Sequence, residues 1–301
     1  MDPITYIDRK TGKVEQEQVY GAKALNLLYG KGWLTTFFGG PIAHLCARLP
    51  FFSAFFGYLK TRPSSVNQIA PFIKNFKIDT SEFQDHQQSF TTFNDFFIRK
   101  LKPSARPIAV DKDLAIIPAD GRYWFYQHYN LAEGIIVKGE RFDLKTLLDN
   151  KELANEYSEG AMVIARLCPT DYHRFHFPCD CLPGETKLIN GWLYSVNPMA
   201  IKKDLQIFTQ NKRTLCELET KKFGKVLFLE VGATFVGAIH QTYTPQKPCA
   251  KGDEKGYFSF GASSLILLFK PNTIIFDTDL VEATKNHLEI RCLMGQSMGK
   301  C

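Results

Sequence analysis

The chain has little tryptophan and no uninterrupted apolar run of the length that crosses a membrane. Only 3 of its 301 residues are Trp, against 25 Phe. A spanning helix needs about twenty consecutive apolar residues. The most apolar stretch, residues 21–62, is interrupted by Pro41 and Pro50 and contains His44 and Arg48. Because proline removes a backbone donor and clashes with the preceding turn, we expect short helices here rather than a transmembrane one.

Other features are also missing. The first twenty residues are charged and polar, so we expect no secretory signal and mostly reduced cysteines. Cys179 and Cys181 lack the gap of roughly two to four residues that a zinc knuckle needs, which disfavours a metal site. We find no internal repeat. The net charge of +6 suits an anionic membrane surface or nucleic acid and does not decide between them.

The predicted fold class is α+β, with a β-sheet-rich catalytic core and short N-terminal amphipathic helices. From residue 106, short β-branched and aromatic runs alternate with Gly, Pro and Asp turns, which is typical of strands. The predicted strands cover residues 115–117, 122–126, 134–137, 161–165, 225–229, 265–269 and 273–276. Helices are expected over residues 66–102, 141–155 and 198–207.

The N-terminal part differs in amino-acid composition from the rest of the chain. We expect residues 1–65 to form a helical membrane-association segment and residues 66–301 the catalytic core, joined near Arg62-Pro63-Ser64-Ser65. A helical subdomain packed on the core is the alternative. In the membrane interpretation, aromatic side chains enter lipid and basic ones meet headgroups. The aromatic ones are Trp33, Phe37, Phe38, Phe51, Phe52, Phe55 and Phe56, and the basic ones are Lys23, Lys31, Arg48, Lys60 and Arg62.

Two short segments carry residues suited to proton transfer. Residues 117–121 place Asp120 between a strand end and a glycine, where it is either a functional acid or an Asx-turn residue. Residues 169–178 contain His173 and His176 among three aromatic residues. Apolar walls lower the pKa of a histidine and keep it neutral, as a general base requires. Packed core histidines are one alternative. A His-x-x-His metal site is less favoured, because no matching carboxylate or cysteine set lies nearby.

A third segment, Gly261-Ala262-Ser263-Ser264, places a serine on a small-residue kink ahead of an apolar run. Glycine permits backbone geometries that other residues reach only with strain, and a serine held there can attack the preceding peptide bond. The segment lacks the Gly-x-Ser-x-Gly pattern of a nucleophile elbow, so a plain serine hydrolase fits poorly. The order Asp120, His176, Ser263 is compatible with a base-activated serine, because triads recur in several chain orders.

Six motifs follow one another along the chain: FNDFFIRKLKP at 93–103, PADG at 118–121, YHRFHFP at 172–178, LYSVNP at 193–198, VGAT at 231–234 and GASS at 261–264. Together they resemble the phosphatidylserine decarboxylase family, in the family's order and over about residues 90–285. As a set they are highly specific. The hydrophobic N-terminus also resembles the family's membrane-binding helices.

The resemblance implies a self-cut enzyme. Ser263 would attack the carbonyl of Ala262, cutting the chain into 1–262 (beta chain) and 263–301 (alpha chain), and Ser263 would become a pyruvoyl group. Asp120 and His176 match the family's positions for the acid and base of this cut. His173 matches the histidine assigned to decarboxylation.

The implied reaction converts phosphatidylserine to phosphatidylethanolamine through a Schiff base, with the pyruvoyl group as electron sink, as pyridoxal phosphate is in other enzymes. The covalent pyruvoyl group is the only cofactor expected, with no metal. The expected partners are phosphatidylserine, an anionic membrane surface and the chain's own alpha and beta pieces, with no nucleic acid. A homodimer stays open. The expected location is peripheral, on the cytoplasmic face of the cell membrane.

One departure from the family concerns the cleavage motif, which is often Leu-Gly-Ser-Thr or Gly-Gly-Ser-Thr. Here Ala262 replaces the glycine and Ser264 the threonine, so Ser264 stays an alternative to Ser263 as the pyruvoyl precursor. Two other functions also stay open: a serine hydrolase acting on lipid esters, and a non-catalytic membrane-binding protein. His240 could line the pocket, but we expect it to be a packed core residue.

Overall fold

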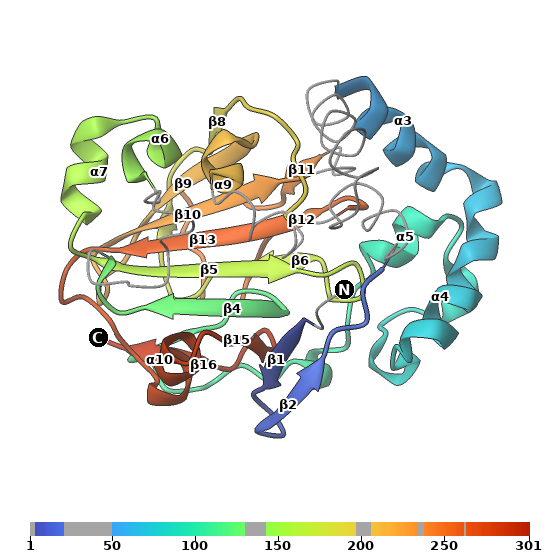
Figure 1. Cartoon of the computed structure of the whole chain (residues 1–301), viewed down its shortest axis with the longest axis horizontal. Helices are drawn as coiled ribbons and strands as arrows, with labels where there is room; N and C mark the ends of the chain where they lie inside the picture. The colour runs from blue at the N-terminus through green and yellow to red at the C-terminus, as the bar shows by residue number, and fades with distance from the viewer. Residues whose placement is uncertain (1–3, 21–49, 130–142, 197–205, 234–237, 262) are drawn as a thin grey trace, which may run out of the picture.

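The computed structural model describes residues 4–20, 50–129, 143–196, 206–233, 238–261 and 263–301 (Figure 1). Within these ranges the fold is α+β, as predicted, and a large sheet forms its centre. No helix in the described ranges is both long and apolar enough to cross a membrane.

Among the described residues the large sheet has ten strands and is antiparallel except for one parallel pair, β1–β15. Its strands, in spatial order, are β2 (Lys13–Gln16), β1 (Thr5–Asp8), β15 (Glu289–Cys292), β4 (Gly121–Tyr126), β5 (Ala161–Leu167), β13 (Ser263–Phe269), β10 (Lys225–Gly232), β9 (Arg213–Glu219) and β7 (Leu182–Pro183), while β8 (Lys187–Ile189) also pairs with β9. The strand that begins at Ser263 therefore lies in the middle of the sheet, between β5 and β10.

Two smaller sheets and a series of short helices complete the fold. One small sheet joins β11 (Ile239–Gln241), β12 (Glu254–Phe258) and β6 (Arg174–His176), and the other joins β14 (Ile275–Phe276), β16 (Ser297–Lys300) and β3 (Leu114–Ile116). The helices of the core are α6 (Leu144–Leu148), α7 (Lys151–Tyr157), α9 (Ile207–Gln210) and α10 (Thr278–Lys285). Those nearer the N-terminus are α3 (Pro50–Thr61), η2 (Pro63–Gln68), α4 (Ile69–Phe76), η3 (Thr80–Glu82), η4 (Gln87–Ser89), α5 (Phe93–Phe97) and η5 (Pro103–Ala105).

The large sheet is buried on both faces, which explains the continuous apolar run after residue 264. Successive side chains of a strand point to opposite faces. Leu265 and Leu267 of β13 accordingly enter one core cluster, and Ile266 and Leu268 enter another. A third cluster is made mainly of phenylalanine and joins α4 and α5 to Phe260, just ahead of β13.

The strand predictions are confirmed wherever they fall on described residues. The predicted strands at 115–117, 122–126, 161–165, 225–229, 265–269 and 273–276 all overlap observed ones. The strand expected at 134–137 lies outside the described residues, as does most of the helix expected at 198–207. The helix expected at 141–155 is two short helices, α6 and α7.

The single long helix predicted over residues 66–102 is wrong. The chain forms α4 and α5 with short 3₁₀ turns before, between and after them. Lys77 ends α4 in the left-handed conformation, with φ of 52°, which a continuing helix does not contain. Asp79 and Thr92 then cap new turns through their side chains, so the polar residues start fresh elements.

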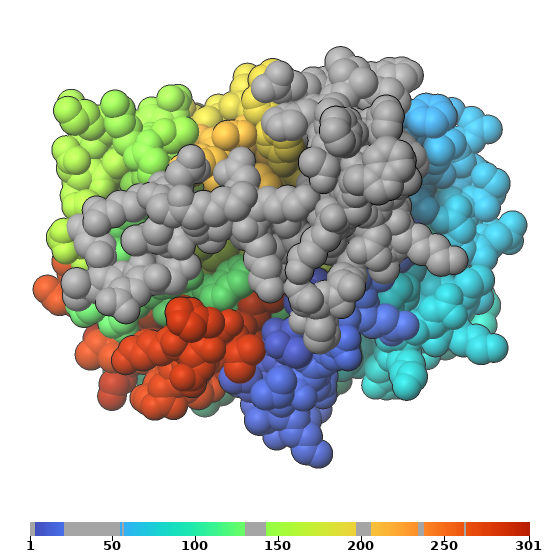
Figure 2. Space-filling model, in the orientation of Figure 1, coloured from blue at the N-terminus to red at the C-terminus, as the bar shows by residue number. Residues whose placement is uncertain are grey.

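The helical segment expected over residues 1–65 is wrong for residues 5–16. These residues form the hairpin β1–β2, and β1 pairs with β15 of the large sheet. Figure 2 shows the N-terminal residues in blue against the C-terminal residues in red. Arg9 strengthens this contact by pairing with Asp277 and Asp279. Residues 50–61 are helical as expected, and residues 21–49 lie outside the described residues.

Candidate active site

Ser263 occupies the first position of the central strand β13 and is fully buried. Its strand neighbours are Gly232 of β10 and Leu167 of β5. The preceding Gly261 has φ of 148°, a value that L side chains rarely adopt, so the kink before the strand requires glycine. The hydroxyl of Ser263 lies 3.5 Å from Nδ1 of His173, ninety positions earlier in the chain. Strand pairing thus brings two distant predicted residues together.

The second ring nitrogen of His173 fixes which tautomer is present. Nε2 lies 2.9 Å from the backbone carbonyl oxygen of Cys168. Because a carbonyl oxygen only accepts hydrogen bonds, Nε2 must carry the proton and donate it. Nδ1 of a neutral imidazole is then an acceptor, and it faces the hydroxyl of Ser263. The arrangement is that of a base beside a nucleophile.

Burial keeps His173 neutral. The side chain is fully buried, and its ring stacks on that of Phe97 with centroids 3.9 Å apart. Desolvation lowers the pKa of His173 from 6.5 to about 3, although the Asp171 carboxylate opposes the shift. The imidazole is therefore uncharged at neutral pH and able to accept a proton.

A tight turn between β5 and β6 positions His173. The Asp171 carboxylate accepts the backbone N–H of Cys168 at 2.7 Å and pairs with the buried guanidinium of Arg122. Burial alone would raise the pKa of Asp171, but the Arg122 charge holds it below its ordinary value. Asp171 thus stays ionised and fixes the turn whose Cys168 carbonyl orients His173.

His176 lies on β6, close in sequence to His173 but with different contacts. Its ring packs beside Tyr172, and its backbone N–H donates to the carbonyl of Pro118 at 2.8 Å. Burial lowers its pKa, while the charges of Glu254 and, more weakly, Asp120 oppose the shift. Among the described residues, Nδ1 of His176 is buried without a hydrogen-bond partner. His176 therefore has a free ring position for a reacting group.

Asp120 lies two residues beyond Pro118 and is buried in an ion pair. Arg106 donates to both carboxylate oxygens, with Nη2 at 2.6 Å from Oδ2, and the backbone N–H of Met294 donates to Oδ1 at 2.9 Å. Asp120 is therefore more than an Asx-turn residue, because it joins the segments before and after residue 263. No hydrogen bond from Asp120 to His176 is present in the described part of the chain.

The predicted site residues thus meet only in part. Ser263 and His173 are in contact, and Asp120 and His176 are neighbours through Pro118. Ser264 Oγ is buried and, among the described atoms, has no partner. Because alternate strand residues face opposite sides, the Ser264 hydroxyl points away from that of Ser263. Ala262 lies outside the described residues.

A buried ion pair next to this site is not predicted by the sequence analysis. Lys255 Nζ lies 2.5 Å from Glu230 Oε1, and both side chains are 0% exposed. Glu230 is paired with Leu265, two residues after Ser263, and Lys255 lies on β12 beside the strand of His176. The sequence does contain a sign that Glu230 is buried, because strand alternation places it on the same inward face as Val226 and Phe228.

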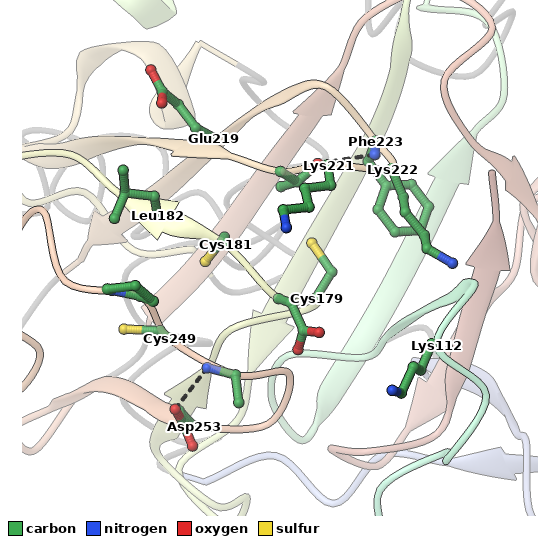
Figure 3. A pocket seen from close by; sticks show the side chains of 14 residues that line it. Lys112, Cys179, Cys181, Leu182, Glu219, Lys221, Lys222, Phe223, Cys249 and Asp253 are labelled. Carbon is green, nitrogen blue, oxygen red and sulfur yellow. Dashed lines mark hydrogen bonds between the residues drawn. The ribbon is translucent and has the colours of Figure 1, made fainter.

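A hollow of about 910 Å³ lies elsewhere, lined in part by Cys179, Cys181 and Cys249 (Figure 3). None of its lining residues is a predicted site residue. Burial raises the pKa of Cys179 to about 12 and also raises that of Cys249, so these thiols are poor nucleophiles. The described ranges contain no cluster of three or more His, Cys, Asp or Glu side chains arranged to hold a metal ion.

Comparison with known proteins decides the family. The sequence model of the family "Phosphatidylserine decarboxylase" matches residues 93–300. The chain belongs to the phosphatidylserine decarboxylase family. It is therefore an enzyme, a decarboxylase of the carboxy-lyase class.

Relatives match the chain along its whole length. A protein named phosphatidylserine decarboxylase proenzyme from Chlamydia caviae is 48% identical, over 100% of this chain and 99% of the relative. One of the same name from Chlamydia pneumoniae is 47% identical over 100% and 98%. One from Fusobacterium nucleatum is 41% identical over 99% and 98%. The resemblance found from motifs is thereby confirmed, and it extends beyond the residues 90–285 first identified.

Proposed function

We propose that this enzyme decarboxylates phosphatidylserine to phosphatidylethanolamine with a pyruvoyl group made from its own Ser263. The observation that carries the proposal is the buried hydroxyl of Ser263, 3.5 Å from the acceptor nitrogen of a neutral histidine and two residues after the kink at Gly261. The name "proenzyme" carried by the relatives fits a chain that matures by cutting itself.

The proposed cut proceeds in three balanced steps. Ser263 Oγ bonds to the carbonyl carbon of Ala262 as the Ala262–Ser263 C–N bond breaks, leaving an ester and a free amine. Loss of the Ser263 Cα proton then expels the Ala262 carboxylate from Cβ and leaves dehydroalanine. The enamine tautomerises to an imine, and water replaces ammonia to give a ketone. The products are chains 1–262 and 263–301.

The residues present fit a pyruvoyl group at position 263. The position is fully buried, and β13 pairs with β5 along residues 263–269 and with β10 along residues 263–268. A pyruvoyl carbonyl at this position would react with the amine of the substrate and supply the electron sink for decarboxylation. His173 contributes a neutral imidazole at the same place, able to hold or move a proton at Nδ1.

Two histidines compete for the role of base in the cut. The resemblance assigns that role to His176 with Asp120, whereas the contact to the Ser263 hydroxyl is made by His173. We expect His176→Ala to block the cut if the family assignment holds, and His173→Ala, which loses the contact to the Ser263 hydroxyl, to slow the cut without blocking it and to abolish decarboxylation. A chain with His173→Ala that stays whole, beside a cut chain with His176→Ala, would reverse the two roles. A denaturing gel measures the cut, and CO₂ release from phosphatidylserine labelled in its serine group measures decarboxylation.

The principal test compares Ser263→Ala with Ser264→Ala. We expect Ser263→Ala to remain one chain of 301 residues and Ser264→Ala to be cut. A serine hydrolase acting on lipid esters would instead stay whole as wild type and react with a serine-directed phosphonate. A non-catalytic membrane-binding protein would stay whole and release no CO₂. Normal cutting of Ser263→Ala would refute the assignment of the precursor.

We also propose that the enzyme associates peripherally with the cytoplasmic face of the cell membrane. The support is α3 and the turn after it, where Tyr58 and Leu59 are exposed next to Lys60 and Arg62. Apolar and basic side chains on one short helix suit an anionic lipid surface.

The membrane proposal is tested on vesicles of phosphatidylserine and phosphatidylcholine. We expect Tyr58→Asp with Leu59→Asp to weaken binding at least about tenfold, since two apolar side chains become charged. Ile275→Asp, at a 61% exposed apolar position on β14, is the control that should bind as wild type. Equal binding by all three proteins would exclude α3 as the contact.

A further inference from the structure

The short helix α5 contacts the segment before the bond that the proposed cut would break and the histidine beside the Ser263 hydroxyl. We propose that Asn94 and Phe97 are positioning residues for the self-cut, holding the chain ahead of the Ala262–Ser263 bond and the histidine beside the attacking hydroxyl. This inference rests on the proposed function, and it adds residues on α5 to the machinery of maturation.

Asn94 holds the chain just before the scissile bond. Its side-chain oxygen, Oδ1, accepts the backbone N–H of Phe260 at 2.9 Å. The Phe260 ring is buried and packs edge-on against Phe93 and Phe97, with centroids 5.4 Å and 5.1 Å apart. Residue 260 is therefore fixed by a hydrogen bond and two ring contacts, all from α5. Only the kinked Gly261 separates it from Ala262.

Phe97 and Arg99 hold His173 and the turn that carries it. The Phe97 ring stacks on His173 at 3.9 Å with an interplanar angle of 25°. Two residues further on, Arg99 donates to the backbone carbonyls of Thr170 and Asp171, in the turn that carries His173. Phe97 thus touches both His173 and Phe260, so one side chain links the histidine beside the Ser263 hydroxyl to the segment before the scissile bond.

The helix is anchored well enough to act as a fixed reference. Thr92 caps it by accepting the backbone N–H of Asp95, and Ser65 Oγ accepts the N–H of Phe93 at 2.9 Å. Phe96 is fully buried in the phenylalanine cluster. In Figure 1, α5 lies beside the ends of β5 and β6, between the sheet core and α4.

Self-cutting is an intramolecular attack, and its rate depends on holding reacting atoms in a near-attack arrangement. Misplacement by about 1 Å can slow such a reaction by about 100-fold. The backbone of Ser263 is held by the sheet, so the freedom that α5 removes is that of the preceding segment and of the imidazole. Loosening either contact should slow the cut while β13 stays in place.

The experiment follows the cut directly in full-length chains made by cell-free synthesis with labelled methionine. Met1, Met162 and Met199 label the long product, and Met294 and Met298 label the short one. The variants are Asn94→Ala, Asn94→Asp, Phe97→Leu and Phe97→Tyr, each compared with wild type and the uncut Ser263→Ala chain. Asn150→Ala is the control for Asn94, because Asn150 accepts a backbone N–H from Leu153 in the same way at α7. Phe90→Leu is the control for Phe97, because it belongs to the same cluster and its ring contacts are with Phe83 and Phe96.

We expect Asn94→Ala and Phe97→Leu to cut about 10- to 100-fold more slowly than wild type. Asn94→Asp and Phe97→Tyr should recover most of the rate, since they restore the acceptor and the ring. The two controls should cut within about twofold of wild type, and a purely structural role predicts instead that Phe90→Leu slows as much as Phe97→Leu. Wild-type rates in Asn94→Ala and Phe97→Leu would overturn the positioning role alone. A wild-type chain that never cuts would overturn the proposed function itself.

Discussion

The buried pair Lys255–Glu230 gives a quantitative prediction about how the site is supported. Lys255 Nζ donates to Glu230 at 2.5 Å and to Gln241 Oε1 at 2.9 Å, and Glu230 also accepts the hydroxyl of Thr214. Three aromatic rings surround the ammonium, those of Phe175, Phe228 and Tyr243 at 5.7, 5.0 and 5.0 Å. Neither charge reaches solvent, so each depends on the other for compensation.

Removing one partner leaves the other charge buried and unpaired, which costs about 3–5 kcal/mol of folding free energy. We therefore expect Lys255→Met and Glu230→Gln each to lower the free energy of unfolding by about that amount. The double variant should cost less than the sum of the two, with a coupling energy of about 1–3 kcal/mol. Lys225→Met is the matched control, because Lys225 lies on β10 with Glu230. Its pair with Glu217 of β9 is 42% exposed on both sides and should contribute at most about 1 kcal/mol.

The assay is urea unfolding at neutral pH followed by circular dichroism. All variants carry Ser263→Ala, so that one uncut chain unfolds and the result does not depend on the association of two pieces. The reasoning would be refuted if Lys255→Met cost no more than Lys225→Met, or if the two single changes added without coupling. Either result would mean that water reaches the pair in solution.

Two further predictions concern charge near the site. Burial lowers the pKa of His173 from 6.5 to about 3, so the unfolded state binds a proton first as pH falls. Stability should therefore decline between about pH 6.5 and pH 3 by up to about 1.4 kcal/mol per pH unit, and His173→Gln should flatten that decline in urea titrations at several pH values; an unchanged slope would contradict it. Glu17, on the segment after the N-terminal hairpin, pairs with buried Arg166 at 2.6 Å. Glu17→Gln should cost about 1.5–3 kcal/mol, whereas Lys13→Gln on the exposed hairpin should change thermal stability by less than about 0.5 kcal/mol; equal effects would show that the carboxylate is dispensable.

The strands could be predicted from the sequence because their cause is local. Runs such as 161–165 and 225–229 are apolar and β-branched, and they end at glycine or charged residues. The prediction of a long helix at 66–102 was wrong for a reason that the spacing of apolar residues does not reveal. Its apolar residues pack as separate turns around the phenylalanine cluster, each begun by a polar cap and not by continuation of the last. The prediction for residues 5–16 was wrong because the strand that pairs with β1, β15, lies some 280 positions away in the sequence.

Most of the site residues could be proposed from motifs, but their geometry could not. The contact between Ser263 and His173 depends on β13 pairing with β5 and on the turn that follows β5. No pattern within the 173–176 segment shows which histidine faces the serine. The roles proposed for Asn94 and Phe97 were equally hidden, since both lie in a motif that carries no titratable group suited to the chemistry. Only the packing of α5 against Phe260 and His173 singles them out.

The most direct measurement is the intact mass of the purified wild-type protein under denaturing conditions, read together with N-terminal sequencing. A pyruvoyl precursor at Ser263 predicts two species, one of residues 1–262 and one of residues 263–301 whose blocked N-terminus is lighter than a serine N-terminus by the mass of one ammonia. One species with the mass of all 301 residues, from a preparation that still releases CO₂ from phosphatidylserine at full rate, would contradict the account.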